Sequence, residues 1–536
     1  MTQTGTGDRQ LVRSSALVGL GTALSRVTGM LRVLVIARIG IQLLTDNYNA
    51  ANNTPNILYE LLLGGILTAT LVPLFVEYTE QGDERGPAAI NTVAVAVLAV
   101  TAFVGIVLAP MIMRPYFLGV HRATRESEIR LAATFLRFFM PQVFFYGLFA
   151  LITAILNAHR RFVAAAFAPV LNNVVVIAIF LAIPEIHPGR LDVATVQDSL
   201  GLRLLMGLGT TAGIVAMTLA LFPALHRAGL RFRLTRHWRH PAVRKLVRLS
   251  GWTIGYVVAN QIAFWVANFL ALRHASDLTV YLVAFTFFQL PHGLFAVSIM
   301  TTITPELAAC DLGGDTVGFR RHFSLGLRLL GLVIIPATVI TLVMSRPIVN
   351  AFVWHGRVTG HDAAVVAQTL VAFGTGLVFF SVYLYTLRAF YAQRDTRTPF
   401  VVNCLENGVN IVAAFALYPL LGVQGLALAW SIAYAVASVV AVAALRRRIG
   451  SLDGTTIVRS FSKMTLAAAA LAVVAWVAVE RIGYGTPARG LAATVVGLTA
   501  GAAVYVAVLW LLHVGELRLL VGSFVRRKVE PPPPGV

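Results

Sequence analysis

Two arginines, Arg26 and Arg32, lie in a stretch that is otherwise apolar enough to form a membrane helix. A charge in hydrocarbon is costly, so such a residue faces a wet cavity or a partner and usually marks a transport path or a binding site. The alternative is that each arginine reaches the membrane surface along its flexible stem or makes a structural ion pair. The two residues are six positions apart, about 240° around a straight helix, so they should not share a face unless Gly29 breaks the helix.

The segment that follows, residues 47–60, is polar where a lipid-facing helix would be apolar, and it reads N-Y-N-A-A-N-N-T-P-N-I-L-Y-E. If the turn between two antiparallel helices centres near Leu43, Arg26 and Glu60 lie 17 residues before and after it, roughly 25 Å along each helix. We therefore expect Arg26 and Glu60 to share a depth and to pair. In this register Arg32 lies level with the polar residues Asn52, Asn53, Thr54 and Asn56.

The rest of the chain must supply the helices that position these residues. Of its 536 residues, 57% are hydrophobic and only 12% are charged, with a mean hydropathy of +0.78. Apolar runs near 20 residues recur along the whole length, as membrane-spanning helices require. The composition therefore predicts an all-α polytopic membrane protein. No cleavable signal peptide is expected, because residues 1–10 are polar and the first apolar run is long enough to span. The two cysteines indicate neither a disulfide framework nor a metal site.

Apolar periodicity predicts about fourteen membrane helices. Their approximate ranges are 14–40, 45–79, 87–112, 129–157, 163–183, 203–225, 243–273, 277–310, 321–346, 363–391, 398–419, 422–446, 460–481 and 489–515.

Basic residues gather in every second connection, and the longest such segment, residues 227–248, contains no acid. A net charge of +20 could indicate nucleic-acid binding, but the excess falls in short loops, which membrane orientation explains better. The positive-inside rule places both termini in the cytoplasm of a bacterial cell, with the chain crossing the cytoplasmic membrane many times. The loop at 114–130 mixes acids and bases and should be external.

An internal repeat appears at an offset of 234 residues, since Ala158, Arg160 and Asn173 recur as Ala392, Arg394 and Asn407. Two six-helix halves in the same orientation are a known transporter plan, with the site at their interface. We expect an N-terminal lobe at 1–225, a basic cytoplasmic linker at 226–242, a C-terminal lobe at 243–446, two extra membrane helices at 447–515, and a basic, proline-rich cytoplasmic tail at 516–536.

The second half is less charged and more aromatic than the first. Its aromatic residues, Trp265, Phe285, Phe287 and Phe288, either face an amphiphilic substrate with an anionic head or simply pack between helices. The predicted helix at 398–419 carries a polar patch, Glu406, Asn407 and Asn410, which either hosts a coupling cation or packs helices together.

Several motifs, taken in order, resemble the MurJ/MviN family of lipid II flippases, of the actinobacterial type. They are S-R-x-x-G-x-x-R at 25–32, T-D at 45–46, P-N at 55–56, L-N-A-H-R-R-F-V-A-A-A-F-A-P-V-L-N-N at 156–173, H-P-A-V-R-K-L-V-R-L at 240–249, F-Y-A-Q-R-D-T-R-T-P at 390–399 and G-V-Q-G-L-A-L-A at 422–429. The resemblance implies the V-shaped fold of the multidrug/oligosaccharidyl-lipid/polysaccharide exporter superfamily, with two extra helices that form a groove for a polyprenyl tail. It also implies transport of lipid-linked peptidoglycan precursor from the inner to the outer leaflet.

The resemblance further implies that Arg26 and Arg32 bind the diphosphate. The full set of candidate substrate-binding residues is Arg26, Arg32, Asp46, Asn53, Asn56, Glu60 and Arg273. The chain departs from the family at Tyr59, Glu60 and Thr286, where many or some members have arginine, so the cavity should be less cationic. Arg273 is a candidate replacement, and Glu60 is a candidate partner that releases Arg26 when diphosphate competes.

No catalytic triad, metal or nucleotide motif stands out, so we expect a transporter that is not an enzyme and has no cofactor. Energy would come from an ion gradient, the membrane potential or substrate flux. The expected partners are lipid II, membrane lipid and, through the C-terminal tail, cell-wall synthesis or regulatory proteins, but no nucleic acid. The alternatives are an exporter of another polyprenyl-linked saccharide, a drug or cation exporter, which should carry acids in its cavity, and a non-transport membrane scaffold.

Overall fold

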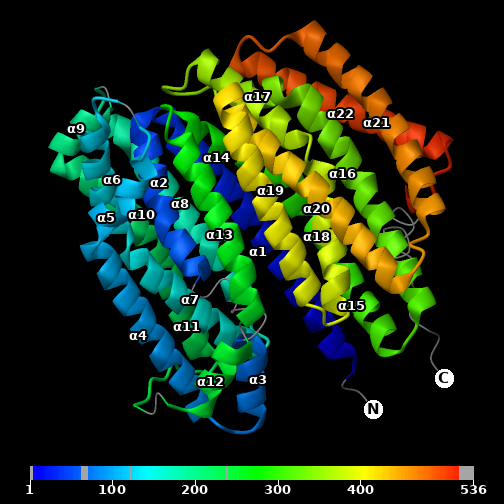
Figure 1. Ribbon diagram of the computed structural model, residues 1–536, viewed down its shortest axis with the longest axis horizontal. Coiled ribbons are helices and arrows are strands. Elements are labelled where there is room, and N and C mark those ends of the chain that lie inside the picture. The colour runs from blue at the N-terminus through cyan, green and yellow to red at the C-terminus, as the bar shows by residue number, and fades with distance from the viewer. Residues whose placement is uncertain are drawn as a thin grey trace. The chain divides into compact units, whose positions relative to one another are not determined.

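The computed structural model describes residues 4–61, 71–120, 122–189, 191–236, 239–249 and 251–517, and all regular elements in these ranges are helical (Figure 1). The first fourteen elements are α1 (Thr4–Arg38), α2 (Leu43–Tyr59), α3 (Val72–Glu80), α4 (Arg85–Val107), α5 (Ala109–Met113), η3 (Arg114–Phe117), α6 (Arg125–Phe139), α7 (Pro141–Ala158), α8 (Val163–Ile186), α9 (Val193–Asp198), α10 (Leu200–Leu219), α11 (Leu221–Arg227), α12 (Pro241–Leu249) and α13 (Gly251–Ala271). The others are α14 (Asp277–Pro291), the π-helix η4 (His292–Ala296), α15 (Val297–Leu312), α16 (Thr316–Phe352), α17 (Gly360–Gly374), α18 (Leu377–Ala392), α19 (Arg397–Leu421), α20 (Val423–Ile449), α21 (Gly454–Ile482) and α22 (Pro487–Leu511).

The all-helical membrane class is confirmed, whereas the count of fourteen spans stays a prediction. Over the described residues, eleven helices are long and apolar enough to cross a membrane, or twelve if α17 and α18, bent by 46°, form one span. The expected helices at 45–79 and 243–273 are not among them. The first is too polar in its described part, and residues 62–70 lie outside the description. The second is described in two pieces, in which Gly255–Ala271 is a shorter apolar helix.

The chain packs into two compact units, each described by itself below. The first comprises Met1–Val283 with Gly356–Val358, and the second comprises Ala284–His355 with Thr359–Val536. These units follow packing, whereas the expected lobes follow the repeat, so the lobe boundaries stay a prediction. The expected tail at 516–536 lies outside the described residues from position 518 onward.

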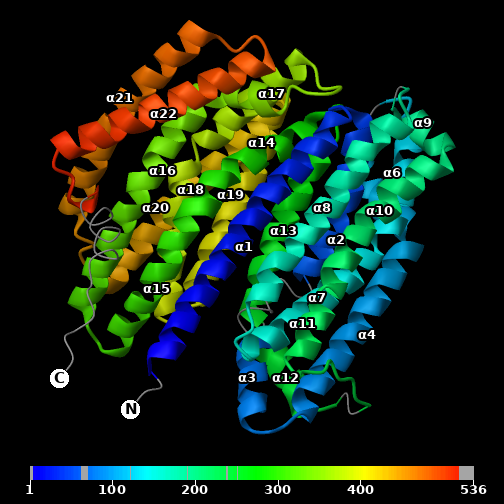
Figure 2. The same cartoon turned by 180° about the vertical axis from the view of Figure 1, so that it is seen from behind.

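In the first unit, α1 packs along α8 (Figure 2). Gly21 allows this close approach, because a Cβ there would lie 2.9 Å from the ring of Phe167. Nearer the middle, Nδ2 of Asn173 donates to the Ser25 carbonyl oxygen at 3.2 Å and to Oγ1 of Thr28 at 3.0 Å. Gly29 does not break the helix, since α1 is one helix from Thr4 to Arg38. These contacts from α8 offset the cost of a mid-helix glycine, about 1 kcal/mol.

The predicted repeat recurs in the backbone of the two units. Arg160 and Arg394 both have φ of 58°, in the left-handed region. In each case the next residue, Arg161 or Asp395, donates its N–H five residues back, at 2.8 and 3.0 Å, which closes a Schellman turn. The following helices, α8 and α19, then begin 234 residues apart, at Val163 and Arg397. The same turn therefore ends the fourth predicted helix of each half.

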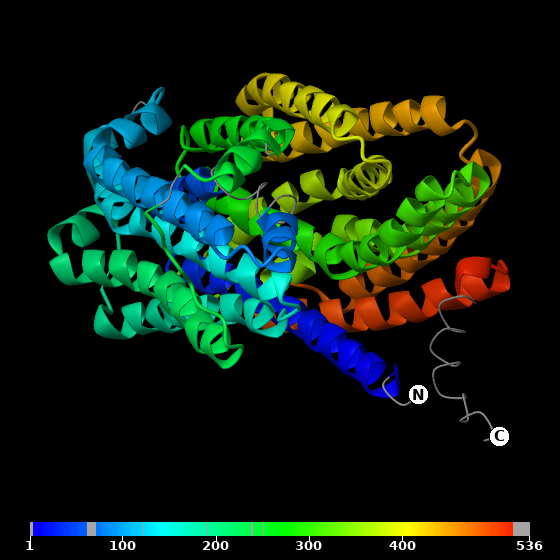
Figure 3. The same cartoon turned by 90° about the horizontal axis from the view of Figure 1, so that it is seen from below.

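The second unit is built around the 37-residue α16, which contacts α15, α17, α18, α21 and α22. The last two helices lie side by side (Figure 3), and Tyr505 of α22 donates to the Leu332 carbonyl oxygen of α16 at 2.8 Å. Elsewhere in the unit, Phe288 is fully buried and its ring centroid lies 4.7 Å from that of Trp430. For Phe288 the structure therefore supports helix packing, the simpler of the two interpretations.

Candidate functional site

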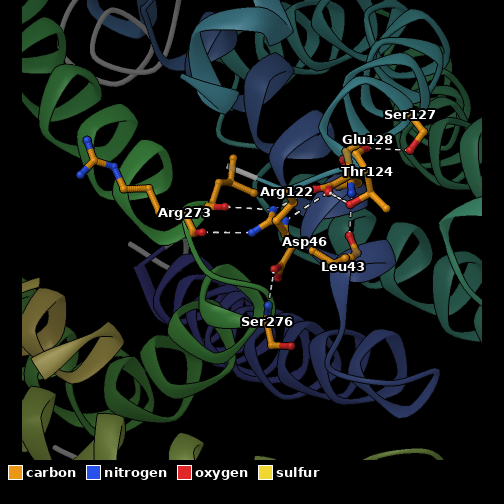
Figure 4. Close-up of polar contacts among 10 residues, drawn as sticks. Leu43, Asp46, Arg122, Thr124, Ser127, Glu128, Arg273 and Ser276 are labelled. Carbon is orange, nitrogen blue, oxygen red and sulfur yellow. Dashed lines mark hydrogen bonds and ion pairs between the residues drawn. The ribbon is translucent and has the colours of Figure 1, made fainter. Parts of the chain in front are cut away.

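The first turn of α2 places Asp46 against the start of α14. Asp46 is 1% exposed. Its carboxylate accepts the backbone N–H of Ser276 at 2.6 Å, the backbone N–H of Thr279 at 2.9 Å and the Thr279 hydroxyl at 2.6 Å. Figure 4 shows the bond to Ser276. Asp46 thus caps the N-terminus of α14 from another helix, satisfying donors that a helix start leaves unpaired. In this conformation its oxygens are used by the protein itself.

The polar face of α2 continues this contact along two further positions. Nδ2 of Asn49 donates to Oγ1 of Thr279 at 3.2 Å, and Nδ2 of Asn53 donates to Oδ1 of Asn268, in α13, at 3.1 Å. We refer to these contacts of Asp46, Asn49 and Asn53 as the polar ladder. A neutral hydrogen bond contributes only about 1 kcal/mol net, and a bond to a charged group such as Asp46 about 1.5–3 kcal/mol, because water replaces a lost partner. An interface of this kind can therefore open into a wet cavity at a modest cost.

Arg122 holds the other side of the α13–α14 turn. Its NH1 and NH2 groups donate to the carbonyl oxygens of Arg273 and Leu272 at 3.0 and 3.2 Å, as Figure 4 shows for Arg273. Its charge is balanced by Glu128, which is fully buried, pairs with Arg122 at 2.8 Å and accepts from Thr124 at 2.7 Å. A cation at a helix C-terminus is electrostatically favourable. Sequence reasoning treated this loop only as mixed in charge, since backbone carbonyl partners leave no sequence pattern.

Arg273 points away from this cluster (Figure 4). Its guanidinium lies over the ring of Phe269, with 5.0 Å from Cζ to the ring centroid. Such a cation–π contact stabilises the side chain by about 0.5–1 kcal/mol. The structure therefore does not bring the Arg273 side chain together with Asp46.

The two arginines of α1 differ in exposure, as their spacing predicts: Arg26 is exposed and Arg32 is half-buried. Arg32 lies within electrostatic reach of Tyr48 and Tyr146. Within the described part of the chain, neither arginine takes part in an ion pair, nor does Glu60. The expected pair between Arg26 and Glu60 is therefore not formed in this conformation, and both guanidinium groups remain available for an anion.

Asn56 is half-buried and donates from Nδ2 to the Asn52 carbonyl oxygen of its own helix at 3.3 Å. The α-helix of α2 ends at Tyr59, and Glu60 and Leu61 are π-helical. The local widening of a π-turn often accompanies a functional position. Of the predicted site residues, the ladder therefore contains Asp46 and Asn53 but not Asn56 or Glu60.

The predicted coupling site lies in α19 of the second unit. Glu406 and Asn407 are 1% and 5% exposed, and Asn410 is half-buried. Asn407 donates to the carbonyl oxygen of Asn403 at 2.9 Å, whereas Oε2 of Glu406 is buried without a hydrogen-bond partner. An unsatisfied buried carboxylate oxygen can accept a proton or a cation. The described residues contain no group of three or more His, Cys, Asp or Glu side chains that could hold a metal ion.

Comparison with known proteins yields one consistent result. A family model described as "Lipid II flippase MurJ" matches residues 36–524. The chain is 27% identical over 530 residues to a probable lipid II flippase MurJ of Rhizobium meliloti, covering 97% of this chain and 96% of the relative. It is 28% identical over 522 residues to the lipid II flippase MurJ of Burkholderia cenocepacia, covering 94% and 97%.

Solved structures show the same fold. A lipid II flippase MurJ in an inward closed conformation matches with a TM-score of 0.77 at 20% identity, over 93% of this chain and 99% of that one. An inward-facing multidrug resistance MATE family transporter matches with a TM-score of 0.64 at 14% identity, over 82% and 99%.

Proposed function

Because the chain belongs to the lipid II flippase MurJ family, we propose that it moves lipid II from the inner to the outer leaflet of the cytoplasmic membrane. It is a transporter and not an enzyme. A diphosphate sugar cannot cross hydrocarbon unaided, since desolvating its charges is prohibitive. The observation that carries the proposal is the pair Arg26 and Arg32 in α1, neither of which has an ion-pair partner within the described chain.

In this proposal the two guanidinium groups replace water around the diphosphate. Guanidinium binds phosphate oxygens through paired, charge-assisted hydrogen bonds. Arg26 is exposed and makes the first contact, and the half-buried Arg32 holds the head group deeper, near Asn56. Glu60, which follows α2, competes for a freed arginine after release. The polyprenyl tail stays in lipid, along α21 and α22, so only the head needs a polar path.

The polar ladder supplies the gate. If both termini are cytoplasmic, the start of α2 and the α13–α14 turn lie at the external end, so an intact ladder closes that side. Breaking the ladder while the expected lobes, 1–225 and 243–446, rock would expose the site outward. Asp46 and Asn53 act in this scheme as gate residues, and Arg273 moves with the turn that they hold.

Energy for the cycle comes from an ion gradient or the membrane potential. The potential acts on moved charge with about 2.3 kcal/mol per 100 mV per elementary charge. The buried Glu406, with Asn407 and Asn410 on the same helix, is the proposed cation site. The tail after residue 515 is the proposed contact for cell-wall synthesis or regulatory proteins.

Complementation tests the proposal. A bacterium depleted of its own lipid II flippase would receive this chain, and surface-exposed lipid II would be labelled in spheroplasts. The expected result is restored growth and labelling with the wild-type chain and their loss with Arg26→Ala, at equal membrane abundance. Arg481→Ala, at the end of α21, is the matched control and should behave as wild type. Normal growth with Arg26→Ala would refute the role of Arg26, and labelling that never rises with an abundant wild-type chain would point to another polyprenyl-linked saccharide.

A further inference from the structure

The basic segment between the repeats is fastened to the first unit. In the described part of 229–249, it makes three contacts with acids of the α3–α4 region: Lys245 with Glu77 at 2.6 Å, His240 with Asp83 at 3.5 Å between Nε2 and Oδ2, and Arg233 with Glu84. Helices α3, α4 and α12 meet at one end of the unit (Figure 1). The basic segment at 229–249 therefore packs against the helix ends of the first unit and forms a wall there.

Two hydrogen bonds between uncharged groups also join this wall to α4. The backbone N–H of Thr235 donates to Oγ1 of Thr92 at 2.8 Å, and Nδ2 of Asn91 donates to the Arg233 carbonyl oxygen at 3.3 Å. Asn91 and Thr92 lie about two turns inside the N-terminus of α4, which begins at Arg85. The basic segment is thus held to α4 by hydrogen bonds of its backbone. The exposed ion pairs add to this contact.

A cavity of about 400 Å³ remains between this wall and the helix ends. Its lining includes Tyr78 and Glu84 from the α3–α4 region, His159 at the end of α7, Asn91, and Arg231 of the basic segment. That volume falls within the range of about 300–1,000 Å³ found for small-molecule sites. The cavity is far in sequence from the arginines of α1 and shares no residue with the polar ladder.

Asn91 leaves one acceptor unused in this cavity. Its side chain is 2% exposed, its Nδ2 is bonded to the basic segment, and its Oδ1 is buried with no hydrogen-bond partner. Buried polar atoms are nearly always satisfied in folded proteins, by protein groups or by other bound molecules, so this acceptor in a cavity wall is open to a donor from outside the chain. An N–H group of the ligand would satisfy it.

The same cavity also has an uncommitted cation and a second polar nitrogen. Arg231 makes no ion pair within the described chain, whereas the charge of Arg233 is balanced by Glu84. Nδ1 of His159 bonds to the Ile155 carbonyl oxygen at 2.9 Å, so it carries the proton and leaves Nε2 for another partner. The uncommitted guanidinium of Arg231 favours a phosphate group, whereas Nε2 of His159 is left as an acceptor and does not contribute to binding an anion.

We propose that this cavity binds a small phosphorylated molecule that also carries an N–H donor, of which a nucleoside monophosphate is the simplest soluble example. Arg231 binds the phosphate and Oδ1 of Asn91 accepts the N–H. Because one wall is the segment between the repeats, a bound ligand stabilises the docking of that segment on α3 and α4. This site is separate from the proposed transport path and goes beyond lipid II flipping.

The test uses the full purified chain in detergent and in nanodiscs. Thermal unfolding and direct binding would be measured with adenosine and uridine 5′-monophosphates, and with inorganic phosphate at the same ionic strength. We expect both nucleotides to raise the unfolding temperature. Arg231→Gln and Asn91→Leu should each weaken nucleotide binding at least tenfold, while Arg236→Gln, in the same segment but not in the cavity lining, should not.

Arg231 is exposed, so its variant tests the site even if Asn91→Leu fails to fold. Equal responses to phosphate and to nucleotides, both unchanged in Asn91→Leu, would overturn the N–H requirement and hence the proposal. No response to any probe would overturn it as well. Arg231→Gln should still complement flippase depletion, so failure at this site is distinguishable from failure of the proposed transport function.

Discussion

Asp46 of α2 accepts the backbone N–H of Ser276 at 2.6 Å, across 230 residues of sequence, and so caps a helix of the other repeat. Ser276 itself has φ of 78° and donates its hydroxyl to the Ile41 carbonyl oxygen at 3.1 Å. The turn at Ser276 is therefore held in place by α2 and by the connection that precedes it. We propose this contact as a gate because its hydrogen bonds can be exchanged for bonds to water when the helices separate.

Asp46→Ala should both destabilise the protein and shift its accessibility. Loss of a helix cap costs about 0.5–2 kcal/mol of stability. Because this cap also joins α2 to α14, the conformation with an intact polar ladder should lose more stability than the open one. Thermal unfolding and the labelling rate of a cysteine introduced near Asn53 would measure the two effects.

Asp192→Ala is the matched control for this substitution. Asp192 caps its own helix, α9, by accepting the Thr195 N–H at 2.8 Å. The Asp192→Ala substitution should lower stability by a similar amount without changing the rate of cysteine labelling. Equal labelling in the two variants would contradict a gate at Asp46.

Glu128→Gln should destabilise the protein by up to about 3 kcal/mol. A buried ion pair that loses one partner leaves an uncompensated charge, and the partial exposure of Arg122 reduces the usual penalty of about 3–5 kcal/mol. Thermal or denaturant unfolding would measure the loss. Glu77→Gln breaks the exposed pair with Lys245 and should cost less than about 1 kcal/mol.

A double-mutant cycle on Arg122 and Glu128 separates two contributions to stability: their ion pair, and the hydrogen bonds of Arg122 to the carbonyl oxygens at the end of α13. If Arg122 also stabilises the carbonyl oxygens of α13, Arg122→Met should remain destabilising in the Glu128→Gln background. A double variant as stable as Glu128→Gln alone would show that the carbonyl contacts contribute nothing.

Glu406→Gln should abolish the ion dependence of transport while leaving the fold intact. The buried Oε2 atom has no partner, so an uncharged amide of the same shape should leave stability unchanged or raise it. Proteoliposome flipping under imposed sodium and proton gradients would measure the coupling. Unaltered ion dependence in the variant would assign the polar patch of α19 to helix packing, the alternative interpretation.

Stability should fall in acid because of Asp395, in the turn between α18 and α19. Burial acts to raise the pKa of Asp395, but hydrogen bonds from Thr398 and the charge of Arg448, 2.5 Å away, lower it below the ordinary value of 3.8. A lowered pKa stabilises the fold above the unfolded value, and this contribution is lost as pH falls below 3.8 toward the folded pKa.

Asp395→Asn should therefore remove part of the decline in unfolding temperature below pH 4. Arg161 occupies the matching position of the first repeat and has no carboxylate, so Arg161→Asn should leave the acid slope unchanged. Identical slopes in wild type and Asp395→Asn would rule out this carboxylate as a source of acid sensitivity.

Much of the local structure follows from the sequence. Apolar runs and their polar ends predicted where most helices begin and end, since burial in hydrocarbon or protein depends on nearby residues. The match between Arg160 and Arg394 predicted an internal repeat, and both residues have the same left-handed backbone conformation. The motifs predicted the flippase family, whose model matches most of the chain.

Only the tertiary structure decided which polar groups meet. Asp46 pairs with backbone N–H groups of α14, Arg122 with carbonyl oxygens of α13, and the orphan Oδ1 of Asn91 lines a cavity closed by the basic segment. Backbone donors and acceptors belong to every residue, so contacts to them leave no sequence pattern. The arginines of α1 are visible in the sequence because charge in an apolar run is rare, whereas their lack of an ion pair depends on where distant helices come to lie.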